Sequence, residues 1–408
     1  MAQLPSGEPI PESGPLPVGL QFDKERSFHA YVHVPFCRVR CGYCDFNTYT
    51  ATELRGVSQD SFAAHLISEI EHSRSILQAA GAPRRPLASV FFGGGTPTQL
   101  PASDLVAILR SLDTAFGIAP DAEITTEANP DNVDLDYLAE LKRGGFTRVS
   151  FGMQSAVDRV LQVLDRSHSP ARVPQVVAYA KEVGLQTSVD LIYGAPTETI
   201  EDWNITLAAA VALDTDHISA YSLIVEEGTK MARLIRSGQL PEPDEDEQAI
   251  KYELADAALR AAGFDWYELS NWSKSPETAS RHNISYWTGK DWWGYGPGAH
   301  SHVAGVRWWN VKHPAPYVSA LQQGGSPGLE RELLDPESVL EERVLLEIRL
   351  RRGLPVETLR QVKGFDAGKV AGLIADELVE PGSALRGILV LTLKGRLLAD
   401  LVVRELLA

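Results

Sequence analysis

The chain has 408 residues, a formal net charge of −16 at pH 7, 44% hydrophobic residues and 23% charged residues. These values are typical of a globular protein with more than one domain, and the acidic balance disfavours a nucleic-acid partner, which requires clustered Lys and Arg. No apolar run of about 18 residues predicts a membrane span, and three cysteines, an odd number, argue against a disulfide framework and favour the reducing cytoplasm.

Residues 1–27 are rich in proline and polar side chains, which predicts a disordered tail. The chain then alternates between apolar, β-rich runs and amphipathic, helical stretches. The predicted strands are 28–35, 89–94, 123–129, 148–154, 187–194 and 217–224, and the clearest helical stretches are 61–80, 105–116 and 134–145. This order predicts an α/β fold with a parallel sheet, because parallel strands need crossover connections. Six units fall short of the eight of a closed barrel, so residues 28–226 are expected to form a partial, open (β/α)6 barrel.

Beyond the barrel, we expect a C-terminal α+β region in two parts. Residues 227–330 contain the acidic stretch 240–248, which resembles a linker, a helix near 247–262 and an unusually aromatic segment. Residues 331–408 follow the pattern helix, helix, short strand pair, helix. That order predicts a winged-helix-like module at the C-terminus.

Unusual polar residues recur where the predicted strands end. The three cysteines follow the first strand, and the run Gly93-Gly94-Gly95-Thr96-Pro97 follows the second. Glu127, Gln154 and Asp190 lie at the end of, or within, the third, fourth and fifth strands. Buried polar side chains are costly unless they serve a ligand, and barrels of this type place their site at the carboxyl ends of the strands. The pattern therefore predicts one site at this end of the barrel.

All the cysteines, Cys37, Cys41 and Cys44, fall within eight positions, spaced Cys-x3-Cys-x2-Cys. Three thiolates on one short loop can hold three corners of an iron–sulfur cubane, which leaves one iron open to another ligand. Two alternatives remain open at this point. One is a zinc site completed by His33, and the other is a set of buried thiols that bind nothing.

The cysteine loop, read with its surroundings, resembles a known family. CRVRCGYC, the preceding Y-x-H-x-P-F-C, GGGTPT at 93–98 and GAHS at 298–301 are similar to motifs of the HemN/HemW branch of the radical S-adenosylmethionine (SAM) superfamily. The resemblance covers roughly residues 28–408 and implies a [4Fe-4S] cluster whose open iron is chelated by SAM. It also implies the contacts to SAM, which are Tyr31, Tyr43, Gly94, Gly95, Thr96, Glu127, Gln154, Arg166 and Asp190.

These side chains suit the parts of SAM. Glycines let backbone approach a ligand closely, and Glu127 would neutralise the SAM ammonium. Arg166 offers a planar fork suited to a carboxylate, and Asp190 would accept hydrogen bonds from ribose hydroxyls.

Two features separate the members of this branch. Coproporphyrinogen dehydrogenases carry a further cysteine two positions after the third, whereas this chain has Phe46, as in the HemW branch. The sequence His282-Asn283-Ile284-Ser285-Tyr286-Trp287 resembles a HemW-type signature associated with heme. The resemblance implies His282 as an axial ligand and Tyr286 and Trp287 as flat contacts for the porphyrin, with His300 as an alternative ligand.

Together these features predict a cytoplasmic heme chaperone that carries a cluster and SAM and passes heme to an acceptor protein of unknown identity. A homodimer is implied by the resemblance alone, no nucleic-acid partner is expected, and membrane contact is expected only through the acceptor. The main alternative is an oxygen-independent coproporphyrinogen III dehydrogenase. Two further alternatives are an RNA-modifying radical SAM enzyme and a zinc-stabilised barrel. The net charge of −16 disfavours RNA binding.

Overall fold

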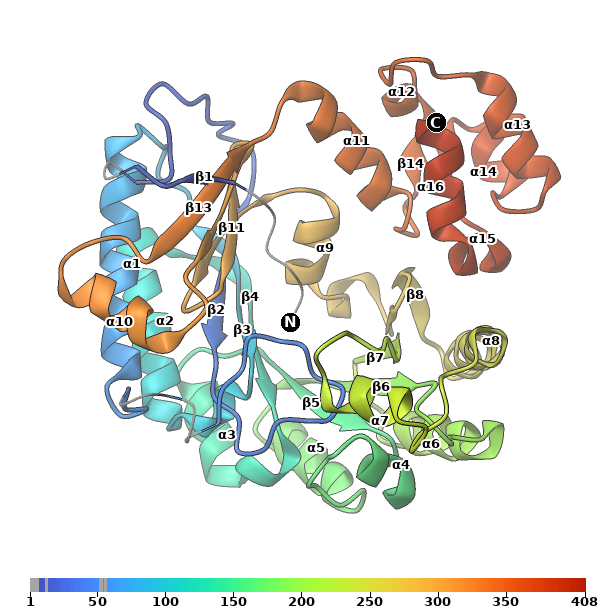
Figure 1. Cartoon of the computed structure of the whole chain (residues 1–408), viewed down its shortest axis with the longest axis horizontal. Coiled ribbons are helices and arrows are strands. Elements are labelled where there is room, and N and C mark those ends of the chain that lie inside the picture. The colour runs from blue at the N-terminus through green and yellow to red at the C-terminus, as the bar shows by residue number, and fades with distance from the viewer. Residues whose placement is uncertain (1–6, 12–13, 51–53, 55–56) are drawn as a thin grey trace.

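The computed structural model describes residues 7–11, 14–50, 54 and 57–408. Its centre is a set of six parallel strands that are neighbours in the order of the chain (Figure 1). They are β2 (Phe28–Val34), β3 (Leu87–Gly94), β4 (Ile118–Ala128), β5 (Arg148–Gln154), β6 (Gln186–Tyr193) and β7 (His217–Ser222). All six strands predicted from the sequence are confirmed, as is the parallel arrangement.

Helices connect these strands and cover the outer side of the curved sheet (Figure 1). They are α1 (Phe62–Ala79), α2 (Ala102–Phe116), α3 (Leu135–Arg143), α4 (Asp158–Val163), α5 (Arg172–Glu182) and α6 (Ile200–Ala212), with short 3-10 turns η2 (Pro97–Gln99) and η3 (Pro130–Asn132). Local signals set several helix starts. Thr199 and Asp202 form a reciprocal capping box at the start of α6, and Asp134 caps α3 by accepting from the Tyr137 N–H.

The region 227–330 extends the sheet at both edges, which the sequence did not predict. After α7 (Lys230–Arg236) and α8 (Glu245–Ala261), β8 (Asp265–Glu268) and β9 (Asn271–Ser273) add antiparallel strands beside β7. The chain then passes through η4 (Pro276–Thr278) and α9 (Arg281–Trp287) to the opposite edge of the sheet. There β10 (Asp291–Tyr295) pairs parallel with β2. Antiparallel strands β11 (His300–Val303), β12 (Val306–Asn310) and β13 (Gly328–Leu333) continue the sheet, with α10 (Pro314–Gln322) between the last two.

The described part of the N-terminal segment is packed against the body, where the sequence had predicted a disordered tail. Strand β1 (Glu8–Pro9) pairs with β13, and Leu16 belongs to the main hydrophobic core. The Arg331 guanidinium bonds the Glu8 carboxylate at 2.7 Å and the Pro15 carbonyl at 2.7 Å. The N-terminal segment is therefore fixed to the body by an edge strand, by the buried Leu16 and by Arg331. Composition alone does not reveal these contacts.

The last part of the chain has a core of its own, built around residues such as Val344, Leu389 and Val402. Its elements are α11 (Pro336–Glu347), β14 (Leu354–Pro355), α12 (Val356–Leu359), α13 (Ala367–Ala375), α14 (Pro381–Leu385), β15 (Ile388–Leu389), α15 (Leu393–Leu397) and α16 (Ala399–Leu407). Strands β14 and β15 form a separate two-stranded antiparallel sheet. The winged-helix-like topology stays a prediction.

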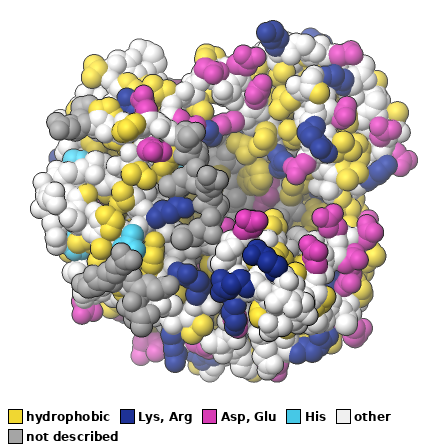
Figure 2. Space-filling model, viewed as in Figure 1, with side chains coloured by type: hydrophobic (Ala, Val, Ile, Leu, Met, Phe, Trp, Pro, Cys, Tyr) yellow, Lys and Arg dark blue, Asp and Glu magenta, His cyan; other side chains and the backbone are white. Residues whose placement is uncertain are grey.

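A buried cation joins this C-terminal module to the region 227–330. Arg396 of α15 lies over the Trp266 ring at 4.5 Å and pairs with Asp256 of α8 at 2.8 Å. Figure 2 shows that the face in view is hollowed near its centre, in the region where Figure 1 draws α9. Within the described part of the chain, no helix has the length and apolar character needed to cross a membrane.

Candidate functional site

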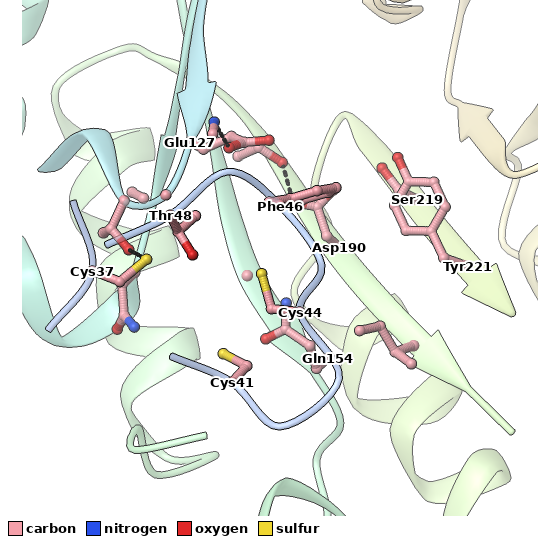
Figure 3. Close-up of a pocket in the computed structure, with 18 of the residues that line it drawn as sticks. Cys37, Cys41, Cys44, Phe46, Thr48, Glu127, Gln154, Asp190, Ser219 and Tyr221 are labelled. Atoms are coloured by element: carbon pink, nitrogen blue, oxygen red, sulfur yellow. Dashed lines mark hydrogen bonds between the residues drawn. The ribbon is translucent and has the colours of Figure 1, made fainter. Parts of the chain in front are cut away.

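A cavity of about 580 Å³ opens at the carboxyl ends of β2 to β7, as the sequence predicted (Figure 3). Its volume is within the usual range for ligand sites. The predicted site residues that line it are Tyr31, Cys37, Cys41, Tyr43, Cys44, Gly94, Gly95, Thr96, Glu127, Gln154, Arg166, Asp190, His282 and Tyr286. Two predicted residues, Trp287 and His300, are not among those lining it.

Two backbone hydrogen bonds shape the cysteine loop, one to Tyr49 beyond it and one within it. The Cys37 N–H donates to the Tyr49 carbonyl at 3.1 Å, and the Cys44 N–H donates to the Cys41 carbonyl at 3.2 Å. All three thiols are partly exposed, and Figure 3 shows their sulfur atoms around one part of the cavity. Burial raises the pKa of Cys44 to about 11, so a positive centre must stabilise its thiolate form. An iron–sulfur cluster bound to the loop would do this.

The geometry fits a cluster better than a single zinc ion. Among the described residues, no three His, Cys, Asp or Glu side chains converge as ligands of one metal ion. A tetrahedral zinc requires such convergence, whereas a cubane receives each thiolate at a different iron corner. The expected fourth zinc ligand, His33, is also engaged at both ring nitrogens, with the Tyr31 hydroxyl at 3.0 Å and the Asn47 carbonyl at 2.9 Å.

Asn47 ties the end of the cysteine loop to the rest of the protein. Its Nδ2 donates to the Pro297 carbonyl at 2.9 Å and to the Lys312 carbonyl at 2.8 Å, and its Oδ1 accepts from the Tyr49 hydroxyl at 3.0 Å. A Cβ on Gly298 would lie 2.5 Å from Asn47 Nδ2, and Gly298 has φ +74°. The glycine of the GAHS motif is therefore needed to admit this amide, which gives the motif a structural role in supporting the loop.

Two glycines at the end of β3 are required by packing against β2 and the residues that follow it. A Cβ on Gly94, which has φ +108°, would lie 2.5 Å from the His33 ring, and one on Gly95 would lie 2.6 Å from the Phe36 carbonyl oxygen. The Gly94 N–H points to the cavity wall and donates to Glu127 Oε2 at 3.2 Å. Neighbouring atoms of the protein itself therefore lie too close to Gly94 and Gly95 for a side chain at either position.

Two carboxyl groups on the cavity wall favour a cationic ligand. Burial, and then the nearby Asp190, raise the pKa of Glu127 to about 8. Burial also raises the pKa of Asp190, whose Oδ2 accepts from the Ser150 hydroxyl at 2.9 Å. A cation between these groups would relieve both the desolvation and the mutual repulsion. The ammonium and sulfonium of SAM are of this kind.

Two buried polar atoms, Oε1 of Gln154 at the end of β5 and Nε of Arg166, have no hydrogen-bond partner among the described residues. Gln154 has φ 55° and is 6% exposed, and its Oε1 has no hydrogen-bond partner among the described residues. Arg166 donates to Cys41 Sγ at 3.4 Å and to the Gly152 carbonyl at 3.1 Å, but its Nε is likewise unpartnered. Buried polar groups are rarely left unpaired, so these atoms fit a bound polar molecule.

Helix α9 places the predicted heme signature against the cavity, and its His282 is buried there. His282 is 2% exposed, its Nδ1 lies 2.7 Å from the Ser89 hydroxyl, and its Nε2 lies 2.8 Å from the Tyr286 hydroxyl. Its ring stacks on Phe91 with centroids 5.2 Å apart. Both ring nitrogens are hydrogen-bonded, so axial ligation would require one of these bonds to break. The alternative, His300, is exposed and stacks on Trp309 outside the cavity lining.

The sequence did not predict a group of buried polar residues near α9. Arg148 pairs with Glu123 at 3.1 Å, and Glu123 also accepts from the His282 N–H at 3.1 Å. His217 bonds the Ser188 hydroxyl at 2.8 Å, and burial holds its pKa well below the usual value, so it is neutral. These residues alternate with apolar ones inside predicted strands, and no spacing singled them out.

Comparison with known proteins gives the family. The radical SAM superfamily model matches residues 31–210. The heme chaperone HemW of Mycobacterium tuberculosis (strain ATCC 25618 / H37Rv) is 46% identical over 93% of this chain and 95% of its own length. The chain belongs to the HemW family of the radical SAM superfamily. HemW of Bacillus subtilis (strain 168) is 31% identical over 86% of this chain and 91% of that protein.

A solved structure confirms the fold of nearly the whole chain. Escherichia coli coproporphyrinogen III oxidase (HemN) superposes with a TM-score of 0.77, over 94% of this chain and 91% of that one, at 24% identity. At this identity the match shows the fold alone. Membership of the radical SAM superfamily confirms the predicted cofactors, a [4Fe-4S] cluster and SAM. Their assignment to individual residues stays a prediction.

Proposed function

We propose that this protein is a heme chaperone, which binds heme and transfers it to an acceptor protein. The observation that carries the proposal is its 46% identity to a curated HemW over 95% of that protein. Phe46, where a dehydrogenase of this branch would carry a cysteine, supports the same conclusion. The acceptor is proposed by its role only, as a protein that receives heme.

In this proposal the cluster is held by Cys37, Cys41 and Cys44, and SAM by the residues of the cavity wall. A cluster with SAM bound supplies one-electron chemistry. The protein's own contribution is to orient these groups. Glu127 would neutralise the ammonium of SAM, and Asp190 would accept hydrogen bonds from its ribose hydroxyls. Arg166, which donates to Cys41 Sγ, would offer the ligand its Nε, which has no partner among the described residues. Reduced thiols are needed for the cluster, which favours the cytoplasm.

An anaerobic hemin titration of the cluster-reconstituted protein, followed at the Soret band, tests the proposal. We expect saturable binding near one hemin per chain. His282→Ala tests the proposed axial ligand, and His72→Ala, a histidine of α1 outside the cavity lining, is the matched control. Weaker binding in the first variant alone supports His282 as the ligand. No hemin binding by the wild type, together with anaerobic conversion of coproporphyrinogen III, would replace the chaperone by the dehydrogenase.

We also propose a homodimer that depends on the cluster. Cys41→Ser, which removes one cluster ligand, should then sediment as a monomer where the reconstituted wild type sediments as a dimer. A dimer that survives this substitution would separate the oligomeric state from the cluster.

A further inference from the structure

Exposed apolar side chains gather around the cavity. Four large hydrophobic residues that line it are exposed, namely Val39 (52%), Phe46 (62%), Tyr221 (44%) and Ile224 (69%). The first two belong to the cysteine loop, and the other two lie at the end of β7 and just after it. Figure 3 shows the Phe46 and Tyr221 rings on these two separate elements. Exposed apolar side chains that gather on the surface of a protein mark a binding site.

This apolar rim (Val39, Phe46, Tyr221 and Ile224) differs chemically from the inner wall of the same cavity. The inner wall carries the carboxyl groups of Glu127 and Asp190 and the unpartnered polar atoms described above. Such a wall suits a charged, polar cofactor. The rim offers wide apolar contact instead, which a flat hydrophobic molecule satisfies.

One cation beside the rim has no partner among the described residues. Arg38 is exposed, lines the cavity and precedes Val39, and no ion pair or hydrogen bond joins it to another described residue. The other two arginines of the lining are already engaged, Arg148 with Glu123 and Arg166 with Cys41. Guanidinium groups bind carboxylates through paired hydrogen bonds. Rim and cation together match an apolar disc that carries carboxylates at its edge.

We propose that heme docks on the apolar rim, with its ring against Phe46 and Ile224 and a propionate on Arg38. The inference rests on the proposed heme-chaperone function and adds the place of the ligand. It gives Phe46 a direct role, because the side chain that stands in place of a cysteine becomes part of the heme-binding surface. It also leaves the choice of axial ligand independent of the rim.

The test is an anaerobic hemin titration of the full chain with its cluster reconstituted. Phe46→Ser, Ile224→Ser and the double variant remove the apolar contact, and Leu385→Ser, an 89% exposed leucine of the C-terminal module, is the matched control. We expect the double variant to raise the hemin dissociation constant at least tenfold and the control to leave it unchanged. Arg38→Gln should raise it less, and the difference from wild type should shrink at high salt because an exposed ion pair is screened.

Ile224 lies outside the cysteine loop, so its substitution leaves the cluster ligands in place. The cluster absorption and the melting temperature are measured in each variant to separate lost contact from a disturbed loop. Wild-type affinity in the double variant would overturn the docking site while leaving the chaperone function standing. A loss confined to Phe46→Ser and accompanied by loss of the cluster would also overturn it. Absence of hemin binding by the wild type would overturn both.

Discussion

Replacing Asn47 by alanine should release the cysteine loop from its support. The Asn47 side chain makes three hydrogen bonds, to the Pro297 and Lys312 carbonyls at 2.9 and 2.8 Å and with the Tyr49 hydroxyl at 3.0 Å. Each bond contributes about 1 kcal/mol net, so losing three costs about 3 kcal/mol. If all of this free energy holds the loop in place, the equilibrium between the held and released loop shifts roughly 100-fold.

The assay follows the visible absorption of the reconstituted cluster after addition of an iron chelator under anaerobic conditions. Asn47→Ala should lose its cluster much faster than wild type, by up to about 100-fold if loop release limits the reaction. Asn204→Ala, at an exposed position of α6, is the control and should match wild type. Asn47→Asp keeps the acceptor for Tyr49 but loses both donors, and should also lose the cluster faster. Equal rates in all four proteins would refute the supporting role of Asn47.

Three further predictions concern buried charges. The affinity for SAM, measured by calorimetry, should rise with pH up to about 8, the pKa of Glu127, because the carboxyl must lose its proton before it can neutralise an ammonium. The Glu127→Gln variant should show no such rise. A wild-type affinity that does not depend on pH would contradict this prediction. Burial raises the pKa of Glu69 from 4.5 to about 7, so the stabilisation of the fold by its protonated carboxyl is fully present below pH 4.5 and is lost as pH rises through 7. The melting temperature of the wild type should fall over this pH window, and that of Glu69→Gln should not. Arg396→Met removes the buried cation beside Asp256, which keeps only the largely exposed Arg260 as an ion-pair partner among the described residues, and should cost about 3 kcal/mol. The loss should be seen as faster proteolysis of the C-terminal module, and unchanged proteolysis would count against this anchor.

The sequence alone was sufficient for the barrel and the position of its site. Apolar runs separated by amphipathic stretches identified all six central strands, because strands buried on both faces leave a strong local signal. The polar residues at the strand ends were brought to one cavity, since the carboxyl ends of parallel strands meet at one edge. The cysteine spacing is equally local, and family comparison confirmed the cluster that it predicted and the SAM that the resemblance implied.

The tertiary structure decided what depends on contacts between distant segments. Strands β10 to β13, and the pairing of β1 with β13, could not be predicted, because edge strands gain their partners from elsewhere in the chain. The sequence predicted His282 as a heme ligand, and only the folded chain shows that Ser89 and Tyr286 hydrogen-bond its two ring nitrogens.

Residue type and spacing therefore predicted three thiols for a cluster, and the family resemblance predicted the residues for SAM. Spacing says nothing of which polar atoms are already satisfied by neighbours remote in sequence. One ring nitrogen of His33 and one of His282 are engaged by Asn47 and Ser89, which lie farther away along the chain, and the other nitrogens by the nearby Tyr31 and Tyr286. Gln154 Oε1 and the Arg38 guanidinium have no partner among the described residues and remain available to a ligand. Only the folded chain makes this distinction, because a hydrogen bond depends on the distance and direction between two atoms and not on their separation in sequence.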